Sequence, residues 1–353
     1  MKQYWSETLR GLSPYVPGEQ PQQVSLLKLN TNENPYAPSP AALAAIRAAA
    51  DGDLRLYPDP DGSALKQAVA AAHGLDTANV FLGNGSDEVL AHAFLGLLKH
   101  PRPLLFPDIT YSFYPVYCAL YDIAYEEIPL DGEFRVRLAD YARPNGGIVL
   151  PNPNAPTGIA LSRAELRSLL AGNPDSVVLV DEAYVDFGAD SAVPLIGEFP
   201  NLLVTQTLSK SHALAGLRVG YALGAPGLIG ALETVKGCFN SYPLDRLALA
   251  GASAALTDNE WFADTCGRIA ASRDWLTAEL GKLGFEVLPS RANFVFARHA
   301  TRSGASLQQA LRARNVLVRR FDRPRIADFL RITVGTQPEC ETLLANLREI
   351  GLD

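Results

Sequence analysis

The feature that most constrains the fold is a repeated alternation of short apolar runs with helical stretches, which begins at about Ser63. The apolar runs predict strands at Leu104–Phe106, Ile148–Leu150, Val177–Val180 and Leu202–Thr205. Helices are predicted between them, including Ser86–Lys99 and Ser162–Ala171, and the second opens with Ser162 and Glu165 in capping-box spacing. Runs that are apolar throughout are typical of a mainly parallel sheet covered on both faces, so we expect an α/β domain.

The last hundred residues follow a different rhythm. A long amphipathic segment, Glu260–Leu280, precedes FEVLPSRANFVFAR, a helix near Leu307–Arg314, NVLVRRF, FLRITVG and a terminal helix, which together predict a small α+β domain. The first forty residues are rich in Pro, Asn and Ser, as suits an extended arm lying over other elements. We therefore divide the chain into an arm (1–40), a large domain (41–250) and a small domain (251–353).

Composition and charge exclude several classes of protein. A formal net charge of −7 provides no basic field for a phosphate backbone, so we expect no nucleic-acid partner. The five histidines show no metal-ligand spacing, and the four cysteines contain no CxxC pair, so we expect no bound metal. The amino terminus lacks an apolar stretch, and Arg47 interrupts the Ala-rich segment Ala41–Ala50, so we expect a cytoplasmic protein with no membrane contact.

Polar residues follow three of the predicted strands. Asn154, Asp181 and Lys210 come shortly after IVL, VVLV and LLVTQT, at the carboxyl ends where open parallel sheets bind their ligands. Taken singly, Lys210 fits a solvated loop, Asp181 a helix cap and Asn154 a turn. Together they place an amine, a carboxylate and an amide on one rim of the sheet. Three separate structural roles explain this grouping less well than a shared binding site does.

The surroundings of the lysine indicate a particular ligand. Ser209 and Arg218 add a phosphate clamp to the Lys210 amine, and a phosphate-carrying aldehyde would use all of these groups. Pyridoxal phosphate is that molecule, and its sites carry a Schiff-base lysine and an acidic partner for the pyridinium nitrogen. We assign these roles to Lys210 and Asp181. The cation of Arg218 and partial desolvation would favour the neutral amine that the lysine needs.

The segment FLGNGSDEVLAHAF supplies a second part of a phosphate site. Gly83 and Gly85 allow a tight turn, and Ser86 starts a helix whose free N–H groups attract anions, although an ordinary Ser-capped helix explains the pattern equally well. Glu88 stands where a dinucleotide fingerprint needs its third glycine, which counts against a nicotinamide dehydrogenase. Tyr111, after the next strand, either stacks on a planar cofactor ring or packs in the core.

Motifs along nearly the whole chain resemble the fold-type-I pyridoxal-phosphate aminotransferases, and more closely the histidinol-phosphate aminotransferases. The TLSK…GLR segment is specific to the wider superfamily, whereas NENPY, DEAYVDF and LRITVGT indicate the narrower family. The resemblance implies a mainly parallel seven-stranded sheet between helices, a small α+β domain, and an arm that packs with the small domain and a partner subunit. It also implies a homodimer.

The resemblance carries roles over to matching positions. The catalytic residues would be Lys210, Asp181 and Tyr184, with Tyr184 near the ring hydroxyl of the cofactor and Tyr111 stacked on its ring. The phosphate would be held by Gly85, Ser86, Asp87, Ser209 and Arg218, and Tyr57 would reach the phosphate in the neighbouring subunit. Thr207 would also contact the cofactor. Arg331 would grip the α-carboxylate of glutamate, and the substrate's phosphate or distal carboxylate would lie among Tyr15, Asn32 and Arg319.

One position departs from the family pattern. The family usually carries Asn directly before Pro-Thr-Gly to bond the cofactor's ring oxygen, and this chain has Ala155 there. Either Asn154, one place earlier, serves as that cofactor contact, or Tyr184 carries the bond with less help.

The expected reaction is transamination between L-histidinol phosphate and 2-oxoglutarate, giving imidazole-acetol phosphate and glutamate in histidine biosynthesis, with Lys210 moving the proton. An aromatic amino-acid aminotransferase and a threonine-phosphate decarboxylase are alternatives on the same scaffold. A non-catalytic sensor fused to a DNA-binding head is disfavoured, because the segment ahead of the arm is short and the charge is acidic.

Overall fold

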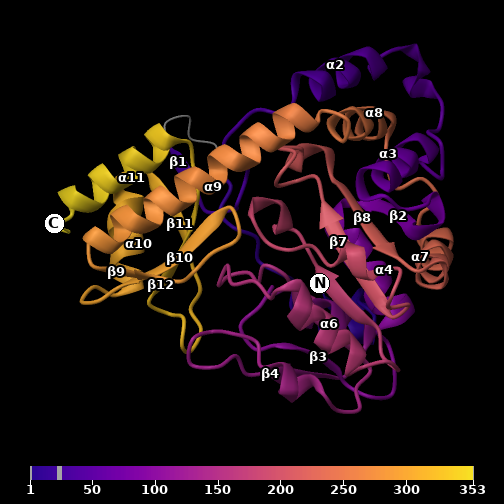
Figure 1. The fold of residues 1–353 in the computed structure, drawn as a ribbon, viewed down its shortest axis with the longest axis horizontal. Coiled ribbons are helices and arrows are strands. Elements are labelled where there is room, and N and C mark those ends of the chain that lie inside the picture. Colours follow the sequence, from indigo (N-terminus) through magenta and orange to yellow (C-terminus); the bar gives the residue numbers. More distant parts are fainter. Residues whose placement is uncertain (1, 22–25, 353) are drawn as a thin grey trace.

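The computed structural model describes residues 2–21 and 26–352, and it places two β-sheets in separate halves of the molecule (Figure 1). The larger sheet has the order β2 (Val80–Asn84), β8 (Val219–Gly224), β7 (Leu202–Thr207), β6 (Val178–Asp181), β5 (Gly147–Pro151), β3 (Leu104–Pro107) and β4 (Tyr125–Ile128). Strand β8 runs antiparallel to both of its neighbours, and the other neighbours are parallel. The expected α/β fold with a mainly parallel seven-stranded sheet is confirmed.

Alternate residues of the central strands face two separate apolar cores. On β6, Val178 and Val180 belong to one core and Leu179 to the other, as the period of two in a strand requires. The first core is shared with helices α2 (Pro40–Ala49), α3 (Ser63–His73), α6 (Arg163–Ala171) and α8 (Arg246–Ala255). The second is shared with α4 (Gly85–Leu97), α5 (Tyr114–Tyr121) and α7 (Pro226–Phe239). Both faces of the sheet are therefore covered, which explains why its strands are apolar throughout.

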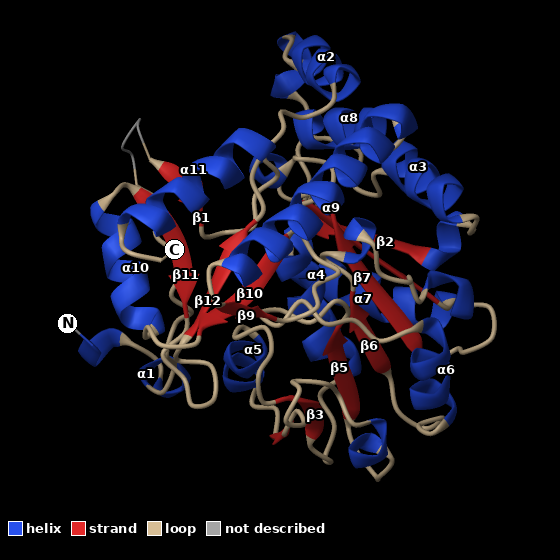
Figure 2. Ribbon diagram, turned by 60° about the vertical axis from the view of Figure 1, so that its left-hand side comes forward, coloured by secondary structure: helices blue, strands red, loops and turns tan. Residues whose placement is uncertain are grey.

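The smaller sheet has the order β1 (Leu27–Leu29), β11 (Val316–Arg320), β12 (Phe329–Thr333), β10 (Phe294–His299) and β9 (Phe285–Val287). Its helices are α9 (Asn259–Lys282), α10 (Gly304–Ala313) and α11 (Gln337–Glu349). Figures 1 and 2 show α9 running from beside α8 across to this sheet. A single apolar core joins α9 and α11 to the sheet and includes Phe187 from the large domain, which ties the two halves together.

The arm contributes regular structure that its composition did not predict. Strand β1 pairs in parallel with β11, so the arm completes the smaller sheet. A short helix, α1 (Glu7–Arg10), begins after Ser6, whose side chain accepts from the Leu9 backbone N–H. Short 3₁₀ turns occupy Lys2–Tyr4, Gly52–Arg55, Thr77–Asn79, Leu138–Tyr141, Val185–Phe187, Val193–Leu195 and Ala215–Leu217.

The strands and helices predicted from apolar periodicity form within a few residues of their expected bounds. The capping box of α6 also forms, because Ser162 Oγ accepts from the Glu165 N–H while Glu165 accepts from the Ser162 N–H. Helix α8 runs through the proposed boundary at 250/251 and packs on α2 and α3. We therefore propose that the large domain extends to Leu256. Among the described residues, no helix combines the length and the apolar character needed to cross a membrane.

Candidate active site

A cavity of about 530 Å³ opens beyond the carboxyl ends of the parallel strands. It is lined by the arm, by the loops of the large sheet, and by β11 and β12 of the small sheet. The predicted residues that line it are Tyr15 and Asn32 of the arm, Ser86, Asp87, Tyr111, Asp181, Tyr184, Thr207, Ser209, Lys210 and Arg218 of the large domain, and Arg319 and Arg331 of the small domain. The fold thus gathers residues that are up to 316 positions apart (331 − 15) around one space.

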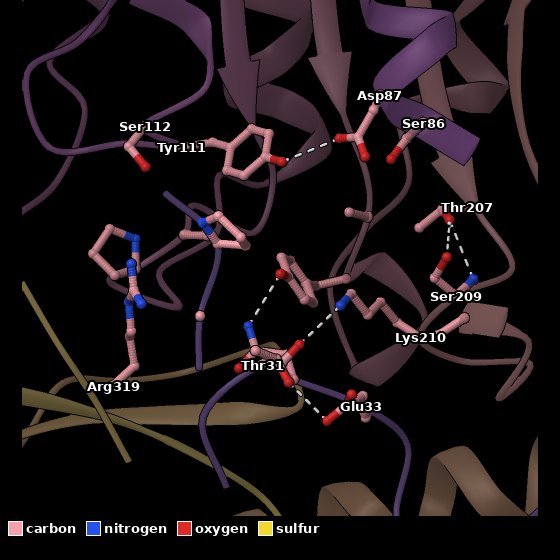
Figure 3. Close-up of a pocket in the computed structure, with 18 of the residues that line it drawn as sticks. Thr31, Glu33, Ser86, Asp87, Tyr111, Ser112, Thr207, Ser209, Lys210 and Arg319 are labelled. Carbon is pink, nitrogen blue, oxygen red and sulfur yellow. Dashed lines mark hydrogen bonds between the residues drawn. The ribbon is translucent and has the colours of Figure 1, made fainter. Parts of the chain in front are cut away.

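Lys210 follows β7 and points its amine into the cavity (Figure 3). Its Nζ donates to the carbonyl oxygen of Thr31 over 3.1 Å, so the arm is in direct contact with the lysine. Burial, and next the positive charge of Arg331, lower the pKa of the Lys210 amine to about 8. About a tenth of this amine is therefore neutral, and able to attack a carbonyl, at pH 7, far more than for an ordinary lysine.

Asp181 is the last residue of β6, and its carboxylate is buried at the cavity wall. The Tyr114 hydroxyl donates to its Oδ2 over 2.9 Å, and the Thr205 hydroxyl donates to its Oδ1 over 3.4 Å. Burial raises the pKa of Asp181 to about 6, against the opposing effect of the Tyr114 bond. Tyr114 is not predictable from the sequence, because TYSFYPVY contains several tyrosines and nothing in their spacing distinguishes the one that reaches β6.

The amino-terminal end of α4 forms an anion-binding corner with Arg218. Gly85 has φ +76°, and a Cβ added there would lie 2.5 Å from Arg218 Nη2, so the absent side chain leaves room for the guanidinium. Arg218 Nη2 donates to Asp87 Oδ2 over 3.0 Å, and the Tyr111 hydroxyl donates to Asp87 Oδ1 over 3.1 Å. The free N–H groups of the helix start and a guanidinium are the groups that bind phosphate.

Three hydroxyl groups complete this corner. Thr207 and Ser209 join through their hydroxyl oxygens over 3.0 Å, and both line the cavity together with Ser86 (Figure 3). Arg319 reaches in from the opposite side of the cavity in the same view. The site therefore has an anion-binding corner in the large domain and, on the opposite side, the Arg319 cation of the small domain.

Two arginines of the small sheet form the far wall. Arg331 Nη2 donates to the Asn30 carbonyl over 2.9 Å, while its buried Nε has no partner among the described residues. Its guanidinium lies over the rings of Phe294 and Phe321, at 5.5 and 5.4 Å from their centroids. Arg319 lies over the same Phe321 ring at 5.5 Å. The aromatic rings hold both cations in place, and the unpartnered Nε is available to an anion in the cavity.

The aromatic residues on the near side pack against one another. Tyr15 of the arm contacts Phe113 at a centroid distance of 4.9 Å and lies 6.3 Å from the Tyr111 ring. Tyr111 also meets Tyr114 edge to face at 5.5 Å. The Tyr111 ring is therefore held by packing and also lines the cavity, where it is available to stack on a planar ring.

The side chains of Asn32 and Tyr184 form a hydrogen bond with each other. Asn32 Nδ2 donates to the Tyr184 hydroxyl oxygen over 3.0 Å, and Asn32 Oδ1 accepts from the Thr333 hydroxyl over 3.1 Å. Asn32 is 1% exposed. Asn32 lines the cavity, as expected of a residue around the substrate's phosphate or distal carboxylate, but both polar atoms of its side chain are engaged by Tyr184 and Thr333.

The sequence left open whether Asn154 contacts the cofactor in place of the residue usual at position 155. The position of the Asn154 side chain bears on this question. Asn154 Nδ2 donates to the Ile109 carbonyl and the Thr157 hydroxyl, and its Oδ1 accepts from Thr110. Ala155, rather than Asn154, lines the cavity. The side chain of Asn154 therefore supports the wall from behind and does not line the space in which a cofactor would lie.

Tyr57 and Gly85 are the remaining predicted residues outside the cavity lining. Tyr57 is 80% exposed and stacks on Tyr242 at a centroid distance of 4.6 Å. Gly85 lies directly before Ser86 and acts through the space it leaves for Arg218.

Glu33 also lines the cavity and was not singled out from the sequence. It forms an ion pair with Lys28 and accepts from the Thr31 hydroxyl over 2.7 Å. These bonds lower the pKa of Glu33, overcoming the opposing effect of its burial. Its position within NENPY was the available signal, because Asn34 of the same motif donates to the backbone carbonyl of Lys210.

The family model for aminotransferase class I and II matches residues 24–347. The chain belongs to the class I and II aminotransferases. A curated relative from Bradyrhizobium diazoefficiens, named histidinol-phosphate aminotransferase 1, is 64% identical over 99% of this chain and 100% of its own length. A relative of the same name from Methylococcus capsulatus is 62% identical over 99% of this chain and 98% of its own length.

A solved structure extends the comparison to the fold of this aminotransferase. The histidinol-phosphate aminotransferase from Sinorhizobium meliloti, in complex with pyridoxal-5'-phosphate, superposes with a TM-score of 0.88 at 26% identity. The match covers 99% of each chain, so arm, large domain and small domain all have counterparts in that protein.

Proposed function

We propose that this aminotransferase transfers an amino group between L-histidinol phosphate and 2-oxoglutarate, giving imidazole-acetol phosphate and glutamate, with pyridoxal phosphate as its cofactor. The observation that carries the proposal is the meeting of Lys210, Asp181 and the Arg218 corner around one cavity. Two relatives, at 64% and 62% identity, are named histidinol-phosphate aminotransferase. Their names support histidinol phosphate as the substrate over an aromatic amino acid or threonine phosphate.

The residues present fit pyridoxal phosphate. An amine with a pKa of about 8 faces the cavity for the aldehyde, and a buried carboxylate stands ready for the ring nitrogen. The space left by Gly85 admits the guanidinium of Arg218 beside a helix start, which suits the phosphate group. The face of Tyr111 suits the aromatic ring.

When bound, the cofactor's protonated ring withdraws the electron pair released at the substrate's α-carbon. We assign the retention of that ring proton to Asp181, whose charge Tyr114 holds in place. The Lys210 amine, which faces the cavity, would be the base that moves the proton at the substrate's α-carbon. The Arg218 corner, with Ser86, Thr207 and Ser209, would hold the cofactor's phosphate in the same cavity as the Lys210 amine.

Two unlike substrates must use the same cavity in turn. Glutamate brings two carboxylates and histidinol phosphate brings a phosphate, and a guanidinium pairs with either group. We assign the α-carboxylate of glutamate to Arg331, whose Nε is unpartnered among the described residues. Arg319 and Tyr15 would contact the substrate's phosphate or the distal carboxylate.

We also propose a homodimer in the cytoplasm. Tyr57 lies near a group of exposed apolar side chains that includes Leu54 and Leu56, and its stacking partner Tyr242 is also exposed. An exposed apolar group of this kind suits a subunit interface, from which Tyr57 would reach the neighbouring phosphate. Charged phosphorylated substrates, which do not cross membranes unaided, suit a cytoplasmic enzyme.

A substrate comparison tests the proposed function. The purified protein is assayed with 2-oxoglutarate and either L-histidinol phosphate, phenylalanine or threonine phosphate, and both products are identified. We expect glutamate to form fastest with histidinol phosphate. Faster turnover of phenylalanine would favour an aromatic aminotransferase, and release of carbon dioxide from threonine phosphate would favour the decarboxylase.

A further inference from the structure

Asn32 joins the arm, the small domain and the large domain at one point. Its backbone N–H donates to Thr333 Oγ1 over 2.9 Å, and Asn293 Nδ2 donates to its carbonyl oxygen over 2.9 Å. Its backbone is left-handed, with φ +57°, a conformation that Asn adopts more readily than most residues. Its side chain bridges Thr333 and Tyr184. The position of Asn32 is therefore fixed through both backbone and side chain.

The hydrogen positions in this group follow from one another. Thr333 Oγ1 accepts from the Asn32 backbone N–H, and Asn32 Oδ1 is the one acceptor that the described residues offer to the Thr333 hydroxyl hydrogen. Thr333 is 3% exposed, and a buried hydroxyl without an acceptor costs about 1–3 kcal/mol. The amide of Asn32 therefore turns its oxygen to Thr333 and its nitrogen to Tyr184.

This orientation determines what Tyr184 does. An amide nitrogen only donates, so the Tyr184 oxygen accepts from Asn32 and its own hydrogen points elsewhere. Within residues 2–21 and 26–352 we find no acceptor for that hydrogen, and Tyr184 lines the cavity. Burial raises the pKa of the Tyr184 phenol, so the hydrogen is retained at neutral pH.

We propose that Thr333 and Asn32 are positioning residues that commit the hydroxyl hydrogen of Tyr184 to the cavity, where it is donated to an oxygen of the bound molecule. The inference rests on the proposed function, in which that oxygen is the ring hydroxyl oxygen of pyridoxal phosphate. Ala155 contributes only a methyl group to the same cavity and cannot donate a hydrogen bond to that oxygen. The hydrogen bond from Tyr184 therefore depends on the direction of its own hydroxyl hydrogen. The small domain thereby controls a donor in the large domain.

The experiment compares pyridoxal phosphate with 3-deoxypyridoxal phosphate, which lacks the ring hydroxyl, by titration into the cofactor-free protein. We expect Thr333→Val to weaken binding of pyridoxal phosphate about tenfold, the loss of roughly one hydrogen bond, and to leave binding of the deoxy compound unchanged. Thr333→Ser keeps the hydroxyl and is the matched control, which should bind both compounds as the unmodified protein does. Asn32→Asp should weaken pyridoxal phosphate further, because a carboxylate draws the Tyr184 hydrogen out of the cavity.

A double-variant cycle separates this role from a merely structural one. In a Tyr184→Phe background, the Thr333→Val change should have no further effect on either compound. Equal losses for both compounds in Thr333→Val, or full additivity with Tyr184→Phe, would overturn the positioning role and leave the proposed function standing. Failure of the unmodified protein to bind either compound would overturn the proposed function itself.

Discussion

The Tyr114 hydroxyl donates to Asp181 Oδ2 over 2.9 Å, which joins the first residue of α5 to the last residue of β6. Tyr114 is 0% exposed, so the bond lies wholly within the protein. It holds the carboxylate toward the cavity and partly offsets the cost of burying its charge. No cation contacts this carboxylate in the part of the chain that the structure describes, so its charge is balanced only when a cationic group binds in the cavity.

This relationship predicts a pH-dependent stability for the cofactor-free protein. The pKa of Asp181 is about 6 when folded and 3.8 ordinarily, so between these values the folded protein binds more protons than the unfolded chain. Stability therefore falls as the pH rises through that window. Asp181→Asn removes this loss and should raise the free energy of unfolding at pH 7 by up to about 3 kcal/mol, with a gain that shrinks toward pH 4. Urea denaturation at the two pH values measures the difference, and an equal gain at both would contradict the account.

The reactivity of Lys210 should follow its lowered pKa. Only the neutral amine attacks the aldehyde, so the rate of cofactor attachment should reach half its maximum near pH 8, the pKa value of about 8 for this group. Arg331→Gln should move that midpoint upward. Burial is the largest cause of the lowered Lys210 pKa, and the positive charge of Arg331 is the second. Stopped-flow absorbance across a pH series measures both midpoints. A midpoint near the ordinary lysine value of 10.5 would show that the amine is not desolvated as the structure indicates.

Gly85→Ala should disturb the anion-binding corner. The new Cβ would lie 2.5 Å from Arg218 Nη2 at a φ of +76°, so we expect a loss of more than about 1 kcal/mol of stability and weaker binding of pyridoxal phosphate. Gly267→Ala in α9 is the control, since nothing lies within 4 Å of its added Cβ, and it should gain about 0.4–1 kcal/mol. Thermal unfolding and cofactor titration measure both variants. Unchanged affinity in Gly85→Ala would argue that the phosphate binds elsewhere.

Arg331→Gln should slow the reaction with glutamate. The change removes a charge-assisted bond worth about 2–3 kcal/mol, so we expect the rate of the glutamate half-reaction to fall about 100-fold. Arg298→Gln is a matched control, because Arg298 pairs with Glu286 on the surface of the small sheet and does not line the cavity. Single-turnover measurements with glutamate alone give both rates. Equal rates in the two variants would remove Arg331 from the proposed carboxylate site.

The sequence was informative where chemistry follows directly from a local pattern. Apolar runs located β6 and β7, and the residues at their ends, Asp181 and Lys210, lie together at the cavity as parallel strands require. The capping box at Ser162 was likewise a local signal, and it forms as expected.

Contacts between distant segments could not be read from such patterns. Asn32 and Thr333 are 301 positions apart, and their bond depends on the pairing of β1 with β11. The antiparallel direction of β8 and the engagement of Asn154 behind the cavity wall depend in the same way on tertiary packing. Propensity and spacing carry no information on these distances, so the structure was needed to separate wall residues from supporting ones.

The most direct test of the central claim is the visible absorption spectrum of the protein reconstituted with pyridoxal phosphate, recorded before and after addition of histidinol phosphate without a keto acid. We expect a yellow band from the cofactor bound to Lys210, which the added substrate converts to the near-ultraviolet band of the amine form. Absence of any band after reconstitution would contradict the assignment of Lys210. A band that histidinol phosphate leaves unchanged would contradict the proposed substrate.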